Sequence, residues 1–297
     1  MNFYIFKFQR KLINILPTIL IIIQSFTSIN NDQYSLYGYN TYFLQENQII
    51  LKIGPGIYSH NSVLYSGFSY KPTYISINNN EQESFTNESI ILNQTENEIK
   101  LIWSTKISTC RNMFKWCNSI AEIDLSGFDS SLVENIDYMF DGCTSLKSIY
   151  FGNFQTIRLN IMLNVFQNCK SLESLDLSSF DTSKVTDFHY MFYNCQSLKF
   201  LDLSNFNTSS CGCTRFMFSG CISLTSLNLS SFNTSKIALM QNMFNNHSKI
   251  LSLDLSNFDT NSCVEMQSMF NGCELLEYVN FKQALISTNL NSNYENI

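Results

Sequence analysis

A period of 26 residues constrains the fold of this chain more than any other feature. Phenylalanine returns at this spacing in seven consecutive copies, without a single insertion: Phe114, Phe140, Phe166, Phe192, Phe218, Phe244 and Phe270. Self-similarity at a fixed interval of this length is typical of a chain in which each copy forms one turn of a stack. A lone turn cannot bury its apolar side chains, so we expect neighbouring turns to cover each other.

Further columns keep the same spacing. A second phenylalanine column contains Phe128, Phe154, Phe180, Phe206, Phe232 and Phe258. An aliphatic column contains Ile123, Ile149, Leu175, Leu201, Leu227, Leu253 and Val279. A cysteine column contains Cys117, Cys143, Cys169, Cys195, Cys221 and Cys273, and His247 stands where one cysteine is missing. We expect these columns to form one continuous core.

The spacing of apolar residues changes within one repeat. Leu201, Leu203 and Phe206 suit a short strand followed by a turn. Val185, Phe188, Met191, Phe192 and Cys195 follow at offsets of 0, 3, 6, 7 and 10, which favours one face of a helix. The sequence therefore predicts an α/β fold in which each turn has a strand and a short helix. Successive strands should form one parallel sheet, with right-handed connections.

The segment between the strand and the expected helix supports this prediction. It reads "FDTS" at residues 180–183, and Asp, Thr and Ser all cap the N-terminus of a helix. The threonine column is Thr156, Thr182, Thr208, Thr234 and Thr260. We interpret these threonines, and the residues before them (Gln155, Asp181, Asn207, Asn233 and Asp259), as helix caps.

The first 28 residues predict a secretory signal peptide. Lys7, Arg10 and Lys11 precede the apolar run "LINILPTILIII", and small polar residues follow it. The alternative is an uncleaved signal anchor, but the run is shorter than a spanning helix and contains proline. We expect no transmembrane span in the mature chain and a secreted or cell-surface location. Candidate N-glycosylation sites are Asn87, Asn93, Asn207, Asn228, Asn233 and Asn246.

The rest of the chain divides at changes of pattern. Residues 29–98 contain short apolar runs between Gly, Pro and Asn, which predict a β-rich N-terminal domain or cap. Residues 99–281 hold the seven repeats, and residues 282–297 form a polar C-terminal tail.

Composition excludes several functions. The net charge is −6, and no block rich in Lys or Arg is present, so a nucleic-acid partner is not expected. The chain contains no GxSxG, P-loop, HExxH or GxGxxG motif, and none of its three histidines stands beside a nucleophile motif. We expect no catalytic residues, no cofactor and no metal ligand.

The ten cysteines have two interpretations. In a secreted chain they suggest disulfides. However, stacked copies place equivalent cysteines about 4.8 Å apart with parallel side chains, which is borderline for a disulfide, so we favour buried free thiols. Zinc at "CGC" (211–213) is disfavoured because no second ligand pair stands at a suitable spacing. The sequence leaves open the state of Cys110, Cys211, Cys213 and Cys263.

A polar column lies between the aliphatic positions of the strands. It predicts either a solvated sheet face or a concave recognition strip. The candidate binding residues are Asp124, Tyr150, Asp176, Phe200, Asp202, Asn228, Asp254 and Tyr278. A third alternative, a glycoside hydrolase that uses Asp176 and Asp202, lacks any burial or partner that would raise a carboxyl pKa.

The repeat "SLxxLDLSxFDTSxVTxMxxMFxxC" resembles that of the BspA-like leucine-rich-repeat surface proteins. The resemblance covers residues 99–281, and "IKLIWSTKISTCRNMFKWC" resembles the entry half-turn of that family. The third turn, "SIYFGNFQTIRLNIMLNVFQNC", departs from the pattern because it lacks the Asp of "LDLS" and the "DTS" cap. The resemblance implies a leucine-rich-repeat solenoid displayed outside the cell, in a family for which adhesion and ligand binding are proposed.

These observations predict a secreted or surface-displayed recognition or adhesion scaffold without catalysis. Its partner would be a protein or a glycan on another surface. The alternative is a structural coat or matrix protein that self-associates end to end through open solenoid ends.

Overall fold

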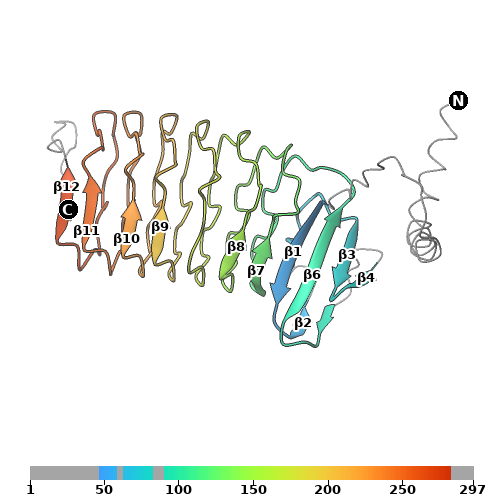
Figure 1. Cartoon of the computed structure of the whole chain (residues 1–297). Coiled ribbons are helices and arrows are strands. Elements are labelled where there is room, and N and C mark those ends of the chain that lie inside the picture. The colour runs from blue at the N-terminus through green and yellow to red at the C-terminus, as the bar shows by residue number, and fades with distance from the viewer. Residues whose placement is uncertain (1–46, 59–62, 83–89, 282–297) are drawn as a thin grey trace, which may run out of the picture. The chain divides into compact units, whose positions relative to one another are not determined.

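The computed structural model describes residues 47–58, 63–82 and 90–281, all of which belong to one compact unit. The predicted signal peptide, Asn87 and the predicted tail at 282–297 lie outside the described residues. Figure 1 shows the N-terminal strands at one end of this unit, with the repeats following in chain order.

Six strands precede the repeats in the described chain. They are β1 (Asn47–Ile53), β2 (Gly56–Tyr58), β3 (Tyr74–Ile77), β4 (Asn80–Gln82), β5 (Ile90–Leu92) and β6 (Asn97–Trp103). Burial alternates along β1 and β6, as expected for strands with one face on a core. β2 pairs with β5, and the larger sheet has the order β4-β3-β6-β1-β7-β8.

The N-terminal strands join the repeats directly. β1 pairs antiparallel with β7 (Ile120–Asp124), the strand of the first full repeat. The indole of Trp103 packs edge-on against Phe128 at 5.7 Å, and the N–H of Tyr65 donates to the carbonyl of Met113 at 2.9 Å. The β-rich segment therefore continues the repeat sheet and covers the first turn of the core.

The repeat strands pair parallel, with a register of one repeat. They are β7, β8 (Ser148–Tyr150), β9 (Phe200–Asp202), β10 (Ser226–Asn228), β11 (Ser252–Leu255) and β12 (Tyr278–Phe281). Representative partners are Ile123 with Ile149, Leu201 with Leu227, and Leu253 with Val279. The predicted pairing of equivalent positions is therefore confirmed.

The prediction of one uninterrupted parallel sheet is wrong. The strands form the separate pairs β7–β8, β9–β10 and β11–β12, and residues 171–178 between β8 and β9 form no strand. The backbone contacts lengthen there: Glu173 N to Lys147 O is 3.3 Å, and Lys199 N to Glu173 O is 3.5 Å. A strand of three residues makes so few bonds that small shifts of this kind interrupt the pairing.

The predicted helices are also absent: the described residues contain strands and turns but no helix. Where a helix was expected, two residues per repeat have positive φ, for example Tyr190 (56°) and Asn194 (61°). The first such column is Asn112, Tyr138, Asn164, Tyr190, Phe216, Asn242 and Ser268. The second is Trp116, Gly142, Asn168, Asn194, Gly220, Asn246 and Gly272. A right-handed helix cannot contain left-handed residues four positions apart, so each segment is a series of tight turns.

Backbone groups in these turns alternate between local and inter-turn bonds. The N–H of Met191 donates to Phe188 O within its turn at 3.1 Å, whereas the N–H of Phe192 donates to Met217 O of the next turn at 2.9 Å. The same inter-turn bond recurs at 2.9–3.0 Å from Phe114, Phe140, Phe166, Phe218 and Phe244. We call this row the turn ladder. It continues through the break between β8 and β9.

The first phenylalanine column forms the centre of the core. Its six successive ring pairs are stacked, with centroids 5.5–5.9 Å apart and planes within 10°. The column is fully buried except for Phe270, which is 8% exposed. The predicted stacking of ring on ring is confirmed.

The cysteine column packs against this core. All ten cysteines are free thiols and nine are buried, so the structure favours the packing interpretation. Cys143, Cys169, Cys195 and Cys221 each donate Sγ–H to a phenylalanine carbonyl of the preceding turn at 3.0–3.2 Å. Burial raises the pKa of the Cys195 thiol well above its usual value, which keeps it protonated.

The threonine column joins turns and does not cap helices. The hydroxyl of Thr182 accepts a hydrogen bond from the N–H of Asn207 at 2.8 Å and donates to its carbonyl at 3.2 Å. Thr156, Thr208 and Thr234 make the same pair of bonds to the following turn. These four hydroxyl-bearing side chains are at most 3% exposed.

The variant Thr182→Val should lower the free energy of unfolding by about 1–3 kcal/mol. Valine has nearly the same shape but leaves the backbone N–H and carbonyl of Asn207 without the buried hydroxyl that partners them. Urea denaturation measures the loss, and Thr182→Ser, which keeps the hydroxyl, should restore most of it. Equal stability of the valine and serine variants would contradict the role of the hydroxyl.

Candidate functional site

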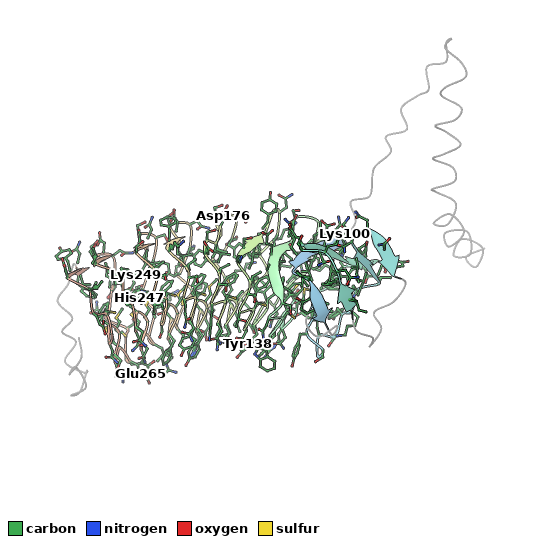
Figure 2. The ribbon with its side chains drawn as sticks, turned by 90° about the horizontal axis from the view of Figure 1, so that it is seen from below. Lys100, Tyr138, Asp176, His247, Lys249 and Glu265 are labelled. Carbon is green, nitrogen blue, oxygen red and sulfur yellow. The ribbon has the colours of Figure 1, made fainter. Side chains whose placement is uncertain are left out.

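The candidate site lies on the outward side of the strands, which we call the strand face. Side chains alternate across a sheet, so its register lines them up in rows. One row runs through Lys100, Ile50, Asp124 and Tyr150. The next runs through Glu98, Lys52, Glu122 and Ser148. In Figure 2, Lys100 and Asp176 lie along one side of the repeats, and Tyr138 and Glu265 of the turns lie along the other.

The strand face has a hollow of about 410 Å³ where β1 meets β7 and β8. We call it the strand hollow. Its lining residues are Ile50, Lys52, Glu98, Glu122, Ile123, Asp124, Ser148, Ile149 and Tyr150. The predicted residues Asp124 and Tyr150 therefore meet at one wall of a depression whose other wall comes from β1 and β6.

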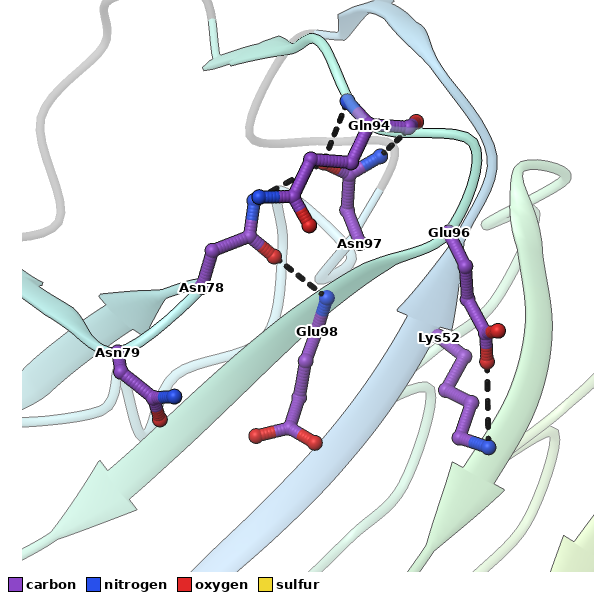
Figure 3. Close-up of a pocket in the computed structure, with 7 residues that line it drawn as sticks. All are labelled: Lys52, Asn78, Asn79, Gln94, Glu96, Asn97 and Glu98. Carbon is purple, nitrogen blue, oxygen red and sulfur yellow. Dashed lines mark hydrogen bonds and ion pairs between the residues drawn. The ribbon is translucent and has the colours of Figure 1, made fainter.

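A second hollow of about 440 Å³ adjoins the first through the shared residues Lys52 and Glu98. We call it the amide hollow. Figure 3 shows its lining residues, which are Lys52, Asn78, Asn79, Gln94, Glu96, Asn97 and Glu98.

Hydrogen bonds fix the amide hollow. Asn97 is fully buried, and its Nδ2 donates to Gln94 O at 2.8 Å and to Ile53 O at 3.3 Å. Asn78 donates Nδ2–H to Asn97 Oδ1 at 3.0 Å and accepts from the N–H of Glu98 at 2.9 Å. The wall is thus formed by side chains with few remaining rotamers, which suits a preorganised binding surface.

Charges on the strand face are largely paired. Lys52 Nζ lies 3.0 Å from Glu122 and 3.2 Å from Glu96, and the hydrogen bond to Glu122 is the main cause of a raised pKa for Lys52. Lys100 pairs with Glu98 at 3.3 Å. Asp124 and Tyr150 therefore stand beside an ion network of two lysines and three glutamates.

The predicted aspartates of the later repeats have a structural role. Asp176 and Asp202 each accept the backbone N–H two residues ahead at 2.9 Å, and Asp254 does so at 3.0 Å. These backbone bonds lower the pKa of all three carboxyls. Asn228 makes the equivalent contact at 3.1 Å, and Asp124 makes it at 2.8 Å. Each side chain thus closes the turn that follows its strand.

Aromatic side chains on the strand face remain open to solvent. Tyr150 is 64% exposed, Phe200 is 56% exposed and Tyr278 is 61% exposed. Of the predicted binding residues, Asp124 and Tyr150 line the strand hollow, while Asp176, Phe200, Asp202, Asn228, Asp254 and Tyr278 continue along the later repeats.

The sequence did not identify the other wall of the strand hollow. Lys52 and Glu98 lie in the N-terminal segment, and their place depends on the antiparallel pairing of β1 with β6 and β7. The alternation of burial in those strands signals an outward face, but pairing across about 70 residues of sequence leaves no local pattern.

The candidate glycosylation sites differ in exposure. Asn93, Asn207, Asn233 and Asn246 are exposed, and Asn228 is half-buried. Asn207 and Asn233 accept the backbone N–H of the serine two residues ahead, at 3.0 and 3.1 Å, in turns where helix caps were expected. No helix in the described part of the chain is long and apolar enough to span a membrane.

Comparison with known proteins gives a family match over the repeats but assigns no activity. The model of a family described as "Mycoplasma protein of unknown function, DUF285" matches residues 108–226 and again residues 197–293. The two matches together cover more than half of the chain. No match was found among curated proteins or among solved structures.

Proposed function

The chain belongs to the DUF285 family, and we propose that it is an extracellular recognition protein whose strand face binds a hydroxyl-rich glycan on another surface. The observation that carries this proposal is the strand hollow, where Asp124 and the exposed ring of Tyr150 meet Lys52 across β1 and β7. Carboxylate, amide and ammonium groups bind hydroxyls, and an exposed aromatic ring packs on the apolar face of a sugar.

We further propose that the repeats form a right-handed leucine-rich-repeat solenoid of the BspA-like kind. The parallel register of one repeat in β7–β8, β9–β10 and β11–β12 supports it. So does the stacked phenylalanine column, because equivalent side chains lie on one another in every turn. In this form each turn uses tight turns where a helix was expected.

The proposal includes no catalytic step. A general acid needs a carboxyl whose pKa is raised toward neutrality, whereas backbone hydrogen bonds lower the pKa of Asp176 and Asp202. The glycoside hydrolase alternative therefore has no support from these two residues.

The proposed extracellular location and the alternative of a coat protein depend on segments outside the strand face. The signal peptide predicted at 1–28 supports secretion or display, and the exposed Asn93, Asn207, Asn233 and Asn246 are compatible with glycosylation. End-to-end assembly through the solenoid ends depends on residues 282–297, which lie outside the described residues, and it stays a prediction.

Tyr150→Asn should weaken glycan binding about tenfold, because it removes the ring at the strand hollow and introduces the residue found at Asn228 in the same column. A glycan array of the mature chain identifies the ligand, and titration calorimetry measures its affinity. The matched control is Tyr278→Ser, which removes an equally exposed ring from the far end of the strand face and introduces the residue found at Ser252. The control should bind as the wild type does.

Three results would contradict the proposal. One is a mature chain that binds no glycan on the array. Another is an equal loss of affinity in the Tyr150 and Tyr278 variants, which would show that the strand hollow is not the binding site. The third is binding to a protein array alone, which would replace the glycan by a protein ligand.

A further inference from the structure

Two neighbouring turns bring together three side chains of metal-binding type. Asp187 and His189 belong to one turn and Cys213 to the next, and the backbone of Asp187 pairs parallel with that of Cys213. One carboxylate oxygen, one ring nitrogen and the Cys213 Sγ all lie within 4.8 Å of one another. Within the described ranges this is the one group of three or more such side chains with this proximity.

We propose that Asp187, His189 and Cys213 bind a zinc ion that joins two neighbouring turns. Zinc takes imidazole nitrogen at about 2.0–2.1 Å, carboxylate oxygen at about 2.0–2.2 Å and thiolate sulfur at about 2.3 Å. Tetrahedral coordination therefore separates sulfur from nitrogen by about 3.5 Å. The distance from Cys213 Sγ to His189 Nδ1 is 3.9 Å, so a small side-chain rotation closes the difference.

The surroundings hold two of the three ligands in place. The N–H of His189 donates to Asp187 Oδ1 at 2.8 Å, which orients the carboxylate and leaves Oδ2 for the metal. The His189 ring stacks on Tyr190 at 4.3 Å, which limits its rotation. Cys213 is buried, while Asp187 and His189 are half-buried, so an ion can reach the group from solvent.

The cation two residues after Cys213 is directed toward other partners. Arg215 hydrogen-bonds Gln241 and forms an ion pair with Glu265, both on later turns, so part of its charge is neutralised there. His189 and Arg215 also line a hollow of about 420 Å³ with Tyr190 and Phe216. Of the three ligands only His189 lines this hollow, and a zinc ion held by three protein ligands would have a fourth position left for water.

Neighbouring repeats explain why the sequence did not reveal this group. The column of Asp187 and Cys213 contains Asn135, Ile161, Leu239 and Glu265 in other turns. The ligands meet only because one repeat separates Asp187 from Cys213, so a search for nearby ligand pairs in the sequence misses them. The zinc proposal does not depend on the strand face or on the proposed glycan.

Cobalt(II) titration of the tag-free mature chain under reducing conditions tests the proposal. We expect one equivalent of cobalt to produce a thiolate-to-cobalt charge-transfer band and the visible bands of a tetrahedral ion, and zinc to abolish both. Cys213→Leu, which introduces the residue found at Leu239, should remove the charge-transfer band. Asp187→Asn, which introduces the residue found at Asn135, should weaken cobalt binding at least tenfold.

Cys211→Val is the matched control, because it removes a thiol two residues away and introduces the residue found at Val185 in the same column. It should keep the band. Thermal unfolding gives an independent measure: zinc at about 100 times its dissociation constant should raise the Tm of the wild type by about 5–10 °C and leave Cys213→Leu unchanged. A wild-type chain without the cobalt band, or a band that survives Cys213→Leu, would overturn the proposal. The first result needs no variant, so it remains decisive even where Cys213→Leu fails to fold.

Discussion

The variant Phe192→Ala is expected to lose about 3–5 kcal/mol of unfolding free energy. Phe192 is fully buried, and its ring stacks on Phe166 at 5.5 Å and on Phe218 at 5.7 Å. Alanine removes both ring contacts and leaves a cavity in the middle of the column. The turns on either side are held by the turn ladder, so they cannot close that space.

Urea denaturation followed by far-ultraviolet circular dichroism measures this loss. The matched control is Phe200→Ala, because Phe200 is 56% exposed on the strand face of the following repeat. The control should change stability by less than about 1 kcal/mol. A similar loss in both variants would show that the phenylalanine column does not carry the stability of the stack.

The second large effect is a pH dependence that arises from His247. This side chain is fully buried in the cysteine column, and its Nε2 donates to Phe218 O at 2.8 Å. Its Nδ1 is buried and has no hydrogen-bond partner in the described chain. Burial lowers the pKa of His247 from 6.5 to about 4, because a charged ring there would be poorly solvated.

The sign of the effect follows from that shift. Between pH 6.5 and 4 the unfolded chain binds a proton at His247 and the folded chain does not, so acid favours unfolding. The contribution of His247 is fully present above pH 6.5 and is lost as the pH falls toward 4. The total loss is about 3 kcal/mol.

His247→Cys isolates this contribution, because cysteine occupies the same column in the neighbouring turns. The free energy of unfolding of this variant should depend less on pH than that of the wild type between pH 6.5 and 4. Urea midpoints measured across this range give the difference between the two chains. Parallel pH profiles would show that His247 keeps its ordinary pKa in the folded chain.

The sequence predicted the core of this protein well, because the core depends on side chains that recur at one spacing. The stacked rings from Phe114 to Phe270 and the pairing of Leu201 with Leu227 both follow from that spacing. Strict register leaves one arrangement in which every large ring is covered by an equivalent ring.

The helix prediction failed because tight turns reproduce the apolar spacing of a helix. A signal against the helix was present: apart from Trp116, the second column consists of residues that tolerate positive φ, namely Gly142, Asn168, Asn194, Gly220, Asn246 and Gly272. The other left-handed column contains Tyr138, Tyr190 and Phe216, which rarely adopt this conformation and conceal the pattern. At these aromatic residues, hydrogen bonds between turns stabilise a left-handed backbone conformation that the residues themselves disfavour.

The candidate site was only half predictable. Asp124 and Tyr150 follow from their positions in the repeat, and the structure places both in the strand hollow. Lys52 and Glu98 reach the strand hollow through the antiparallel pairing of β1 with β6 and β7. No periodic pattern in the sequence predicts this pairing. The meeting of His189 with Cys213 is a separate case, because it follows from the repeat register that pairs Asp187 with Cys213.

The turn ladder also gives the repeats a direction. From Phe114 to Phe244, each of these N–H groups points to a carbonyl of the following turn, so the peptide dipoles in the row are aligned. At the first turn the outermost carbonyl of Met113 meets the N–H of Tyr65, which neutralises that pole. Within the described residues the row ends at the turn of Phe270, so any chain that extends the row there has to meet the N–H of Phe270 with a carbonyl oxygen. Growth of this architecture is therefore polar, as in a filament with unlike ends.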